Sequence, residues 1–149
     1  MSPQQLDHAW IAAHIPHQGG MCLLERVEAW DGDQIRCSAL SHRRIDNPLR
    51  ASGRLGALNA VEYAAQAMAV HGALLAGSST PPTPGFLGSA RSVECLVDRL
   101  DDIDGALSIH AERLSADART LLYAFTVASA AGPLVRGRAA VVLVTASST

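Results

Sequence analysis

Features that direct a protein towards nucleic acid are scarce in this sequence. It contains no lysine, so all 12 basic residues are arginine, and only 17% of its residues are charged. The formal net charge of −2 supplies no field that would attract nucleic acid, and we expect no nucleic-acid partner. Because soluble domains usually carry more charge than this, we also expect an extra buried face, namely a subunit interface.

Long apolar runs and paired cysteines are also lacking. The longest apolar segment, residues 55–76, is interrupted by polar side chains, so we expect no membrane-spanning helix. Residues 1–10 show neither the basic start nor the apolar run of a signal peptide, and we expect a cytoplasmic protein with no membrane partner. The odd number and wide spacing of Cys22, Cys37 and Cys95 predict buried thiols rather than disulfides or metal ligands.

The sequence does have the length and apolar content of one packed domain. Its 149 residues, 48% of them hydrophobic, predict a single domain over residues 1–149. The strongest helical pattern covers residues 55–75, which are rich in Ala, Leu, Met and Gln, and Gly77 is expected to end this helix. A second, short helix is expected near the N-terminus.

Strand patterns lie on both sides of the long helix. Apolar periodicity predicts strands at residues 21–30, 34–40, 92–97, 107–112, 121–128 and 134–144, with turns at 31–33 and 131–133 and a proline-rich loop at 77–85. We therefore predict an α+β fold in which an antiparallel sheet, its last four strands forming a meander, wraps around one long central helix. A ferredoxin-like fold fits less well because only one long helix is predicted.

Three polar side chains share one face of the long helix. Asn59, Glu62 and Gln66 are spaced i, i+3 and i+7, and they are almost the only polar groups between residues 55 and 70. One interpretation is a narrow solvated edge. The other is that Glu62 faces an apolar cavity beside Asn59 and Gln66, where desolvation would keep its carboxyl protonated and able to act as an acid.

Two histidines lie in the segment AHIPHQGGMCLL, residues 13–24. His14 and His17 have no third ligand at a convincing spacing, so we expect no metal site. A surface loop is one interpretation of this segment. A catalytic loop is the other, because the glycines after His17 allow the backbone to approach a ligand closely.

The segment SHRRIDNPLRASGR, residues 41–54, carries four arginines just before the long helix. A helix N-terminus and guanidinium groups both favour phosphate, so Arg43, Arg44, Arg50 and Arg54 are candidates for binding a phosphopantetheine arm or an acidic carrier protein. A solvated basic loop is the alternative. The sequence has no phosphate-binding glycine loop, dinucleotide fingerprint or serine-nucleophile motif.

These motifs resemble those of a known family. HIPHQGGMCLLERV, residues 14–27, resembles the opening element of bacterial 3-hydroxyacyl-ACP dehydratases of the hotdog superfamily, and GALNAVEYAAQ, residues 56–66, resembles the central-helix segment that carries their catalytic carboxylate. GFLGSAR, residues 85–91, is similar to their next strand. PHQGGMCLL, DNPLR, GRL and EYAAQAMAVHGAL together are more similar still to the dehydratase-like proteins of aryl polyene biosynthesis clusters. The resemblance covers residues 14–145 and implies a single hotdog domain.

The resemblance also implies an activity and a set of site residues. We expect dehydration of a 3-hydroxyacyl thioester on an acyl carrier protein to the trans-2-enoyl product, with no cofactor beyond the carrier's phosphopantetheine. Pro48 stands where the housekeeping enzymes have the histidine of their HFPG turn, so we assign the base to His17, with His42 as second choice, and the acid to Glu62. Substrate contacts are expected from the start of the helix and from the strand that follows it: Gly56, Ala57, Asn59, Gln66 and Gly88. The backbone N–H groups of Gly56 and Ala57 are expected to stabilise the enolate oxygen.

The resemblance leaves the assembly and two other functions open. Hotdog proteins usually dimerise by joining sheets, so we expect a homodimer or a heterodimer with another hotdog protein. A hotdog thioesterase would use Glu62 to activate water. A non-catalytic acyl-binding or partner subunit is suggested by the missing HFPG histidine.

Overall fold

The computed structural model describes residues 6–17, 19–77 and 85–144. A short helix, α1 (His8–His14), is capped by Asp7, whose carboxylate accepts a hydrogen bond from the Trp10 amide at 3.0 Å. The hairpin of β1 (Arg26–Trp30) and β2 (Gln34–Ala39) comes next, then α2 (Ala60–Ala76). The remaining strands are β3 (Gly85–Cys95), β4 (Leu107–Ala116), β5 (Thr120–Ser129) and β6 (Gly132–Leu143).

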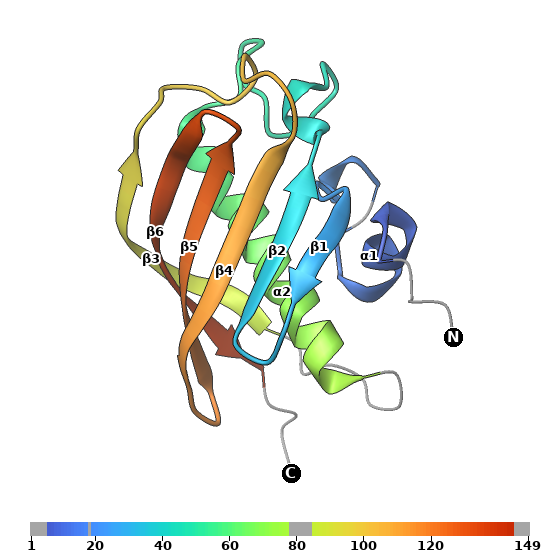
Figure 1. Ribbon diagram of the computed structural model, residues 1–149, viewed down its shortest axis with the longest axis vertical. Helices are drawn as coiled ribbons and strands as arrows, with labels where there is room; N and C mark the ends of the chain where they lie inside the picture. Colours follow the sequence, from blue (N-terminus) through green and yellow to red (C-terminus); the bar gives the residue numbers. More distant parts are fainter. Residues whose placement is uncertain (1–5, 18, 78–84, 145–149) are drawn as a thin grey trace.

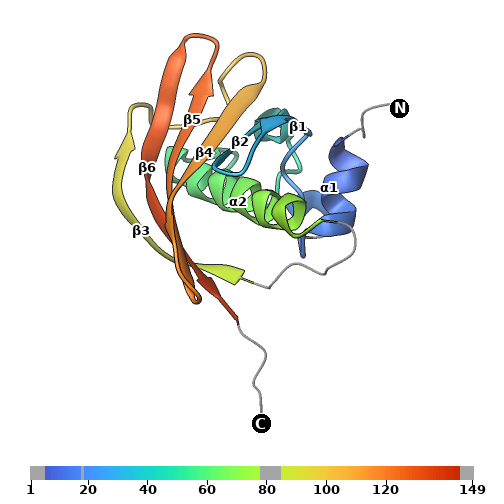
Figure 2. The same ribbon diagram turned by 60° about the horizontal axis from the view of Figure 1, so that its bottom comes forward.

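The six strands form one antiparallel sheet in the order β1-β2-β4-β5-β6-β3. The sheet curves around α2, which lies along its concave face, and α1 lies beyond the β1 edge (Figures 1 and 2). The predicted antiparallel sheet around one long helix is therefore confirmed. This is the arrangement that the resemblance to hotdog proteins implies.

One part of the predicted topology is wrong. β4, β5 and β6 form a meander, but β3 pairs with β6 at the far edge and not with β4. The reason lies in the connection 96–106, which is hydrogen-bonded to the segment before α2: the Leu100 amide donates to Leu55 O at 2.8 Å, and the Ala57 amide donates to Asp98 O at 3.0 Å. The connection 96–106 crosses the upper end of the sheet in Figure 1, so β3 lies at the β6 edge and β4 beside β2.

Some element boundaries differ from the predictions. The long helix begins with a 3₁₀ turn, Ala57–Asn59, and ends at Gly77 as predicted, with a φ of 76° that suits glycine. The first strand begins at Arg26 rather than residue 21, since residues 19–21 form a 3₁₀ turn. The last turn lies at residues 130–131, one residue earlier than expected. Residues 78–84 of the predicted loop lie outside the described residues.

The core forms between the helix and the inner face of the sheet. Alternating residues of β2 and β4 are fully buried, as the period-two pattern predicts: Ile35, Cys37, Ala39, Leu107, Ile109 and Ala111. Cys22 is buried as expected, but the prediction for Cys95 is wrong, because this thiol lies exposed at the end of the edge strand β3. In the described part of the chain, no helix is long and apolar enough to cross a bilayer.

Candidate active site

A cavity of about 500 Å³ lies between α2, the segment after α1 and one end of the sheet. This volume is within the range usual for small-molecule sites. Small residues of α2 line one side of the cavity, and from Glu62 to Gly72 the helix advances about 15 Å. The apolar lining comes from the helix and three strands: Ala65, Met68, Ala69, Gly72, Phe86, Leu87, Leu121, Val141 and Leu143.

The polar wall of this cavity contains two of the predicted catalytic residues. His17 Nε2 lies 3.2 Å from Glu62 Oε1, and the two side chains are 26% and 33% exposed, respectively. Glu62 is in the first turn of α2, and His17 lies in the segment between α1 and the 3₁₀ turn at Gly19–Met21. The fold therefore brings together an imidazole and a carboxyl group that are 45 residues apart in sequence.

The protonation of Glu62 differs from the prediction. The hydrogen bond with His17 lowers the pKa of Glu62 below its ordinary value, although partial burial acts in the opposite direction. The expectation that desolvation keeps this carboxyl protonated is therefore wrong here, because a specific donor outweighs the loss of solvent. The first turn of a helix also favours a carboxylate.

The second ring nitrogen of His17 is unpaired within the described part of the chain. His17 Nδ1 is buried and has no hydrogen-bond partner among the described residues. Most buried polar atoms in proteins are paired, so an unpaired one beside a cavity marks a group with spare bonding capacity. Together, the two side chains can take up a proton at one atom and release a proton from another.

Gln66 holds the segment that follows His17. Its Nε2 donates to Met21 O at 2.6 Å and its Oε1 accepts from the Leu23 amide at 2.9 Å, and the side chain is fully buried. Nearby, Ser41 Oγ donates to Leu23 O at 2.7 Å and bonds the Tyr63 hydroxyl at 2.9 Å. The structure thus fixes Gln66 to backbone groups, and its predicted role as a substrate contact remains a prediction.

At the start of the helix, groups that were predicted to contact substrate form hydrogen bonds within the protein. The Ala57 amide donates to Asp98 O, so it is not free to stabilise an enolate oxygen, contrary to the expectation. Asn59 Nδ2 donates to Gly56 O at 3.1 Å. None of these three residues lines the cavity.

Gly88 has a packing role that the sequence does not reveal. A Cβ at this position would lie 2.6 Å from Val142 Cγ2, so a larger residue would force Val142 or the strand to shift, and glycine allows this close approach of β3 to β6. The pairing register between the two strands shifts at this point, between Leu87 and Ser89. Gly88 does not line the cavity, and its predicted contact with substrate stays a prediction.

His42, the second candidate base, is not brought to Glu62. It is fully buried, and its Nε2 bonds Ile103 O at 3.0 Å. Burial lowers the pKa of His42 below its ordinary value, so the ring is held neutral in the core. The structure places this residue in the packing of the loop that precedes α2, and it does not line the cavity.

Three of the four arginines proposed for carrier binding are engaged by the fold. Arg43 pairs with Asp104, and Arg44 pairs with Asp46 at 3.0 Å. Arg50 donates to the carbonyl oxygens of Arg44 and Gly53 and lies 4.0 Å from the buried carboxylate of Asp101. Arg54 is exposed and has no side-chain ion pair with another described residue.

The stacking of His14 on Trp10 at the cavity wall was not predicted from the sequence. His14 stacks on Trp10, with ring centroids 3.9 Å apart, and its Nδ1 donates to Trp10 O at 2.7 Å. The i, i+4 spacing of these aromatic rings on α1 was the available signal. Within the described residues, no three His, Cys, Asp or Glu side chains converge as metal ligands.

Similar structures were found among solved proteins. A chain of the dehydratase heterocomplex ApeI:P from Xenorhabdus doucetiae superposes with a TM-score of 0.80 at 23% identity, covering 91% of each chain. A mutant thioesterase from Pseudomonas aeruginosa has a TM-score of 0.66 at 18% identity, covering 97% of this chain and 96% of its own. A hypothetical thioesterase with coenzyme A from Streptococcus pneumoniae gives 0.59 at 14% identity, covering 83% and 88%. At these identities the similarity establishes the fold.

The family is established by sequence. A comparison with curated proteins gives no significant match. The family model for ApeP-like proteins, described as ApeP dehydratase, matches residues 9–148, nearly the whole chain. This match confirms the resemblance to hotdog dehydratases, and the chain belongs to the ApeP-like dehydratase family.

Proposed function

We propose that this protein eliminates water from a 3-hydroxyacyl thioester carried on an acyl carrier protein, giving the trans-2-enoyl thioester. The observation that carries the proposal is the His17–Glu62 pair, 3.2 Å apart, at the polar wall of an apolar cavity of about 500 Å³. Such an elimination needs a base for the C2 proton, an acid for the departing hydroxyl and a dry space for the acyl chain. The pair supplies the first two and the cavity the third.

The roles follow from where the shared proton resides. In the active form His17 carries a proton on Nδ1, and a second proton is shared between His17 Nε2 and Glu62 Oε1. When an acyl chain fills the cavity, further desolvation disfavours the charged pair, and the shared proton moves to Glu62. Nε2 then has a free lone pair, and Glu62 has a proton to donate.

The elimination then balances within this pair. His17 Nε2 takes the C2 proton, the C2–H electrons form the C2–C3 double bond, and the C3–O bond breaks as Glu62 protonates the leaving hydroxyl to water. His17 is left as imidazolium and Glu62 as carboxylate. Return of one proton across the 3.2 Å between them restores the starting pair. No metal or further cofactor takes part in this scheme.

The partners are proposed from the family and from one similar structure. ApeI:P is a dehydratase heterocomplex, which favours a second hotdog chain as the partner of this protein. The family match to a dehydratase, together with the resemblance to proteins of aryl polyene clusters, supports a role in fatty acid or polyketide biosynthesis of the aryl polyene type. With a carrier-bound substrate of this kind, we propose a cytoplasmic location for the protein.

A thioesterase is the second candidate function, and one observation favours it. The lowered pKa of Glu62 leaves a carboxylate that can activate water for attack on the thioester carbonyl. Hydrolysis would release a free acid and a thiol, whereas dehydration leaves the thioester intact. A thiol-reactive dye separates the two outcomes.

Mass spectrometry of a 3-hydroxyacyl carrier protein tests the proposal directly. We expect loss of one water with the wild type, no loss with Glu62→Gln or His17→Ala, and normal turnover with His42→Ala if the protein remains folded. Release of free acid would replace the dehydratase by the thioesterase. No mass change with the wild type, alone or with a hotdog partner, would contradict catalysis and leave an acyl-binding subunit.

A further inference from the structure

One glycine lies in the interior of α2, on the side of the helix that lines the cavity. Gly72 is the one glycine of α2, and it lines the cavity together with Ala65, Met68 and Ala69. Glycine in a helix interior is less stable than alanine, because it loses more backbone freedom on folding. The position of Gly72 therefore needs a reason that outweighs this loss of stability.

Backbone conformation and packing within the described part of the chain do not require glycine at this position. Gly72 has a helical backbone, without the positive φ that Gly77 adopts at the helix end. Apart from the adjoining residues and the helix backbone, an added Cβ would meet no described atom within 4 Å. At Gly88 and Gly137, by contrast, the nearest atoms would lie 2.6 Å and 3.1 Å from such a Cβ. The fold therefore has room for a side chain at Gly72, and this room belongs to the cavity.

Gly72 is far along the helix from the polar wall of the cavity. It follows Glu62 by 10 residues, an advance of about 15 Å along α2. An extended acyl chain advances about 1.3 Å per carbon, as the length and angle of C–C bonds dictate. A chain whose C3 lies at Glu62 therefore reaches Gly72 when it has roughly 14 carbons, whereas a hexanoyl chain ends well short of it.

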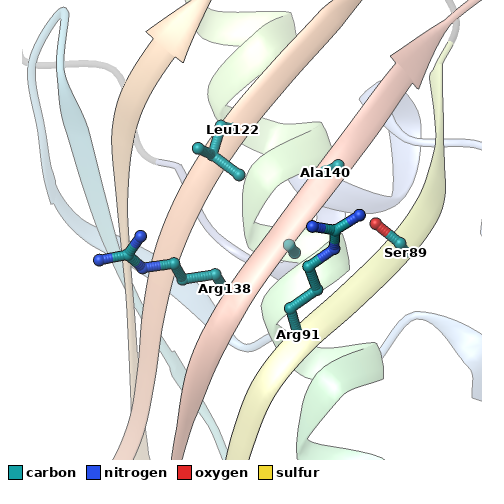
Figure 3. A pocket seen from close by; sticks show the side chains of 6 residues that line it. Ser89, Arg91, Leu122, Arg138 and Ala140 are labelled. Carbon is teal, nitrogen blue, oxygen red and sulfur yellow. The ribbon is translucent and has the colours of Figure 1, made fainter.

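A smaller hollow on the outer face of the sheet does not extend this space. It has a volume of about 190 Å³ and shares no lining residue with the cavity. In Figure 3 its side chains, Arg91 and Arg138 among them, lie in front of the strands, and α2 lies behind the strands. An acyl chain bound beside Glu62 therefore stays on the inner face of the sheet, along α2.

We propose that Gly72 determines the length of acyl chain that the site accepts, because it leaves the far end of the cavity open to long-chain 3-hydroxyacyl groups. This inference rests on the proposed function and adds the class of substrate, namely acyl groups of about 14 carbons. The helix gives up the stability that alanine would supply and gains room for the end of the chain. Gly72 contacts only this end, so it affects chain binding and not the elimination at C2 and C3.

The test adds side chains along the cavity and varies the length of the substrate. The variants are Gly72→Ala, Gly72→Leu and Ala69→Leu, and the matched control Ala76→Leu adds the same side chain on α2 outside the cavity lining. Mass spectrometry follows dehydration of 3-hydroxyhexanoyl, 3-hydroxydecanoyl and 3-hydroxytetradecanoyl carrier protein. In parallel, calorimetric titration measures binding of S-hexyl and S-tetradecyl coenzyme A, thioethers that can be neither dehydrated nor hydrolysed. Thermal unfolding checks the fold of each variant.

We expect the wild type to bind the tetradecyl thioether at least about tenfold more tightly than the hexyl thioether, because each further buried CH₂ group favours binding. Gly72→Leu should raise KM for the tetradecanoyl substrate about tenfold, since its side chain leans along the helix towards Glu62 and displaces the last carbons. Its kcat and its KM for the two shorter substrates should match the wild type. Ala76→Leu should match the wild type with all three substrates.

The other two variants grade the effect. Gly72→Ala should raise KM for the tetradecanoyl substrate about two- to fourfold, since it adds a single methyl group. It should also raise the unfolding midpoint by about 2–4 °C, because alanine favours the helix, so it tests the proposal even if Gly72→Leu does not fold. Ala69→Leu lies about 4.5 Å closer to Glu62 and should also reject the decanoyl substrate, which Gly72→Leu accepts.

Three results would overturn the role of Gly72. The first is a wild-type KM for the tetradecanoyl substrate in the folded Gly72 variants. The second is an equal rise in KM for the hexanoyl substrate, which would mean that the side chain disturbs the site as a whole. The third is tighter binding of the hexyl thioether by the wild type.

The thioethers separate this proposal from the proposed function. If the wild type dehydrates none of the substrates, the proposed function fails, and thioether binding alone decides the role of Gly72. Weaker binding of the tetradecyl thioether by Gly72→Leu, with hexyl binding unchanged, supports this role. Equal binding of the tetradecyl thioether by the wild type and Gly72→Leu, or no binding by the wild type, rejects it.

Discussion

Two histidines in contact with the central helix have opposite surroundings. His71, on α2, is fully buried, and both ring nitrogens are bonded: Nδ1 to the Tyr123 hydroxyl at 2.7 Å and Nε2 to Asp31 O at 2.8 Å. His17 is partly exposed at the cavity and bonds only Glu62 through Nε2, with Nδ1 unpaired among the described residues. Both sites contain an imidazole ring, but both ring nitrogens are hydrogen-bonded in His71 and only one is in His17 among the described residues.

The difference indicates what each site contributes. The His71–Tyr123 contact joins α2 to β5, and the bond to Asp31 joins it to the β1–β2 turn, so its hydrogen bonds stabilise the fold. A fully satisfied buried group has no bond left to offer a substrate. The His17–Glu62 pair has unused capacity and a cavity beside it. We therefore expect substitutions at the first site to change stability and those at the second to change activity.

The largest effect is expected from Glu62→Gln. The amide keeps a hydrogen-bond acceptor for His17 but cannot donate a proton to the leaving hydroxyl, so turnover should fall by about 10²- to 10⁴-fold. Because Glu62 is partly exposed, the unfolding midpoint should change little. Parallel turnover and thermal unfolding measurements check this. A large loss of stability with turnover retained would mean that Glu62 stabilises the fold and does not take part in catalysis.

Gln66→Met should affect both properties, because Gln66 fixes the segment next to His17 to the helix. The thioether keeps the approximate volume but leaves Met21 O and the Leu23 amide without their partner, which should cost about 1–3 kcal/mol for each buried group. Urea unfolding measures that loss.

The activity of Gln66→Met separates positioning from stability. At a temperature well below the unfolding midpoint, kcat should still be reduced because the His17 segment is no longer held. Gln66→Glu retains an acceptor for the Leu23 amide and is expected to recover part of the activity. Full wild-type kcat in folded Gln66→Met would show that His17 is held without this contact.

Much of the fold and part of this site could be predicted because their signals are local. The helix end at Gly77, the β1–β2 hairpin and the burial of Ile35 and Cys37 follow from spacing along a few residues. Glu62 stands out because it is a single carboxylate on an apolar helix. The placement of β3 beside β6 was missed, since it depends on hydrogen bonds between the connection 96–106 and the segment before α2.

The remaining errors concern what each side chain contacts. The pattern shows Gln66 beside Glu62 on one helix face, but not the backbone groups at residues 21 and 23 that Gln66 bonds. It shows arginines before the helix, but not that Asp101, Asp104 and Asp46 engage three of them. The lowered pKa of Glu62 needs the position of His17, which sequence spacing cannot provide.

Tyr123→Phe tests the stabilising site with a smaller change. Loss of the hydroxyl leaves His71 Nδ1 without its donor inside the core, which should cost about 1–3 kcal/mol. For a protein of this size, each kcal/mol lowers the unfolding midpoint by roughly 2–4 °C. Turnover below that midpoint should match the wild type. A comparable loss of kcat would show that the two sites are coupled through α2.

The smallest expected effect is a pH dependence of stability arising from His71. Burial lowers the pKa of His71 below its ordinary value of 6.5, so the folded protein keeps the ring neutral while the unfolded chain takes up a proton below about pH 6.5. Because the unfolded state then binds more protons, the free energy of unfolding falls as the pH decreases from 6.5 towards the folded pKa. Urea unfolding at pH 7.5 and pH 5.5 should show this loss, and His71→Gln should reduce it. His42 titrates in the same direction and remains in the variant, so part of the loss should persist. An identical loss in the wild type and His71→Gln would mean that His71 is not held neutral by the core.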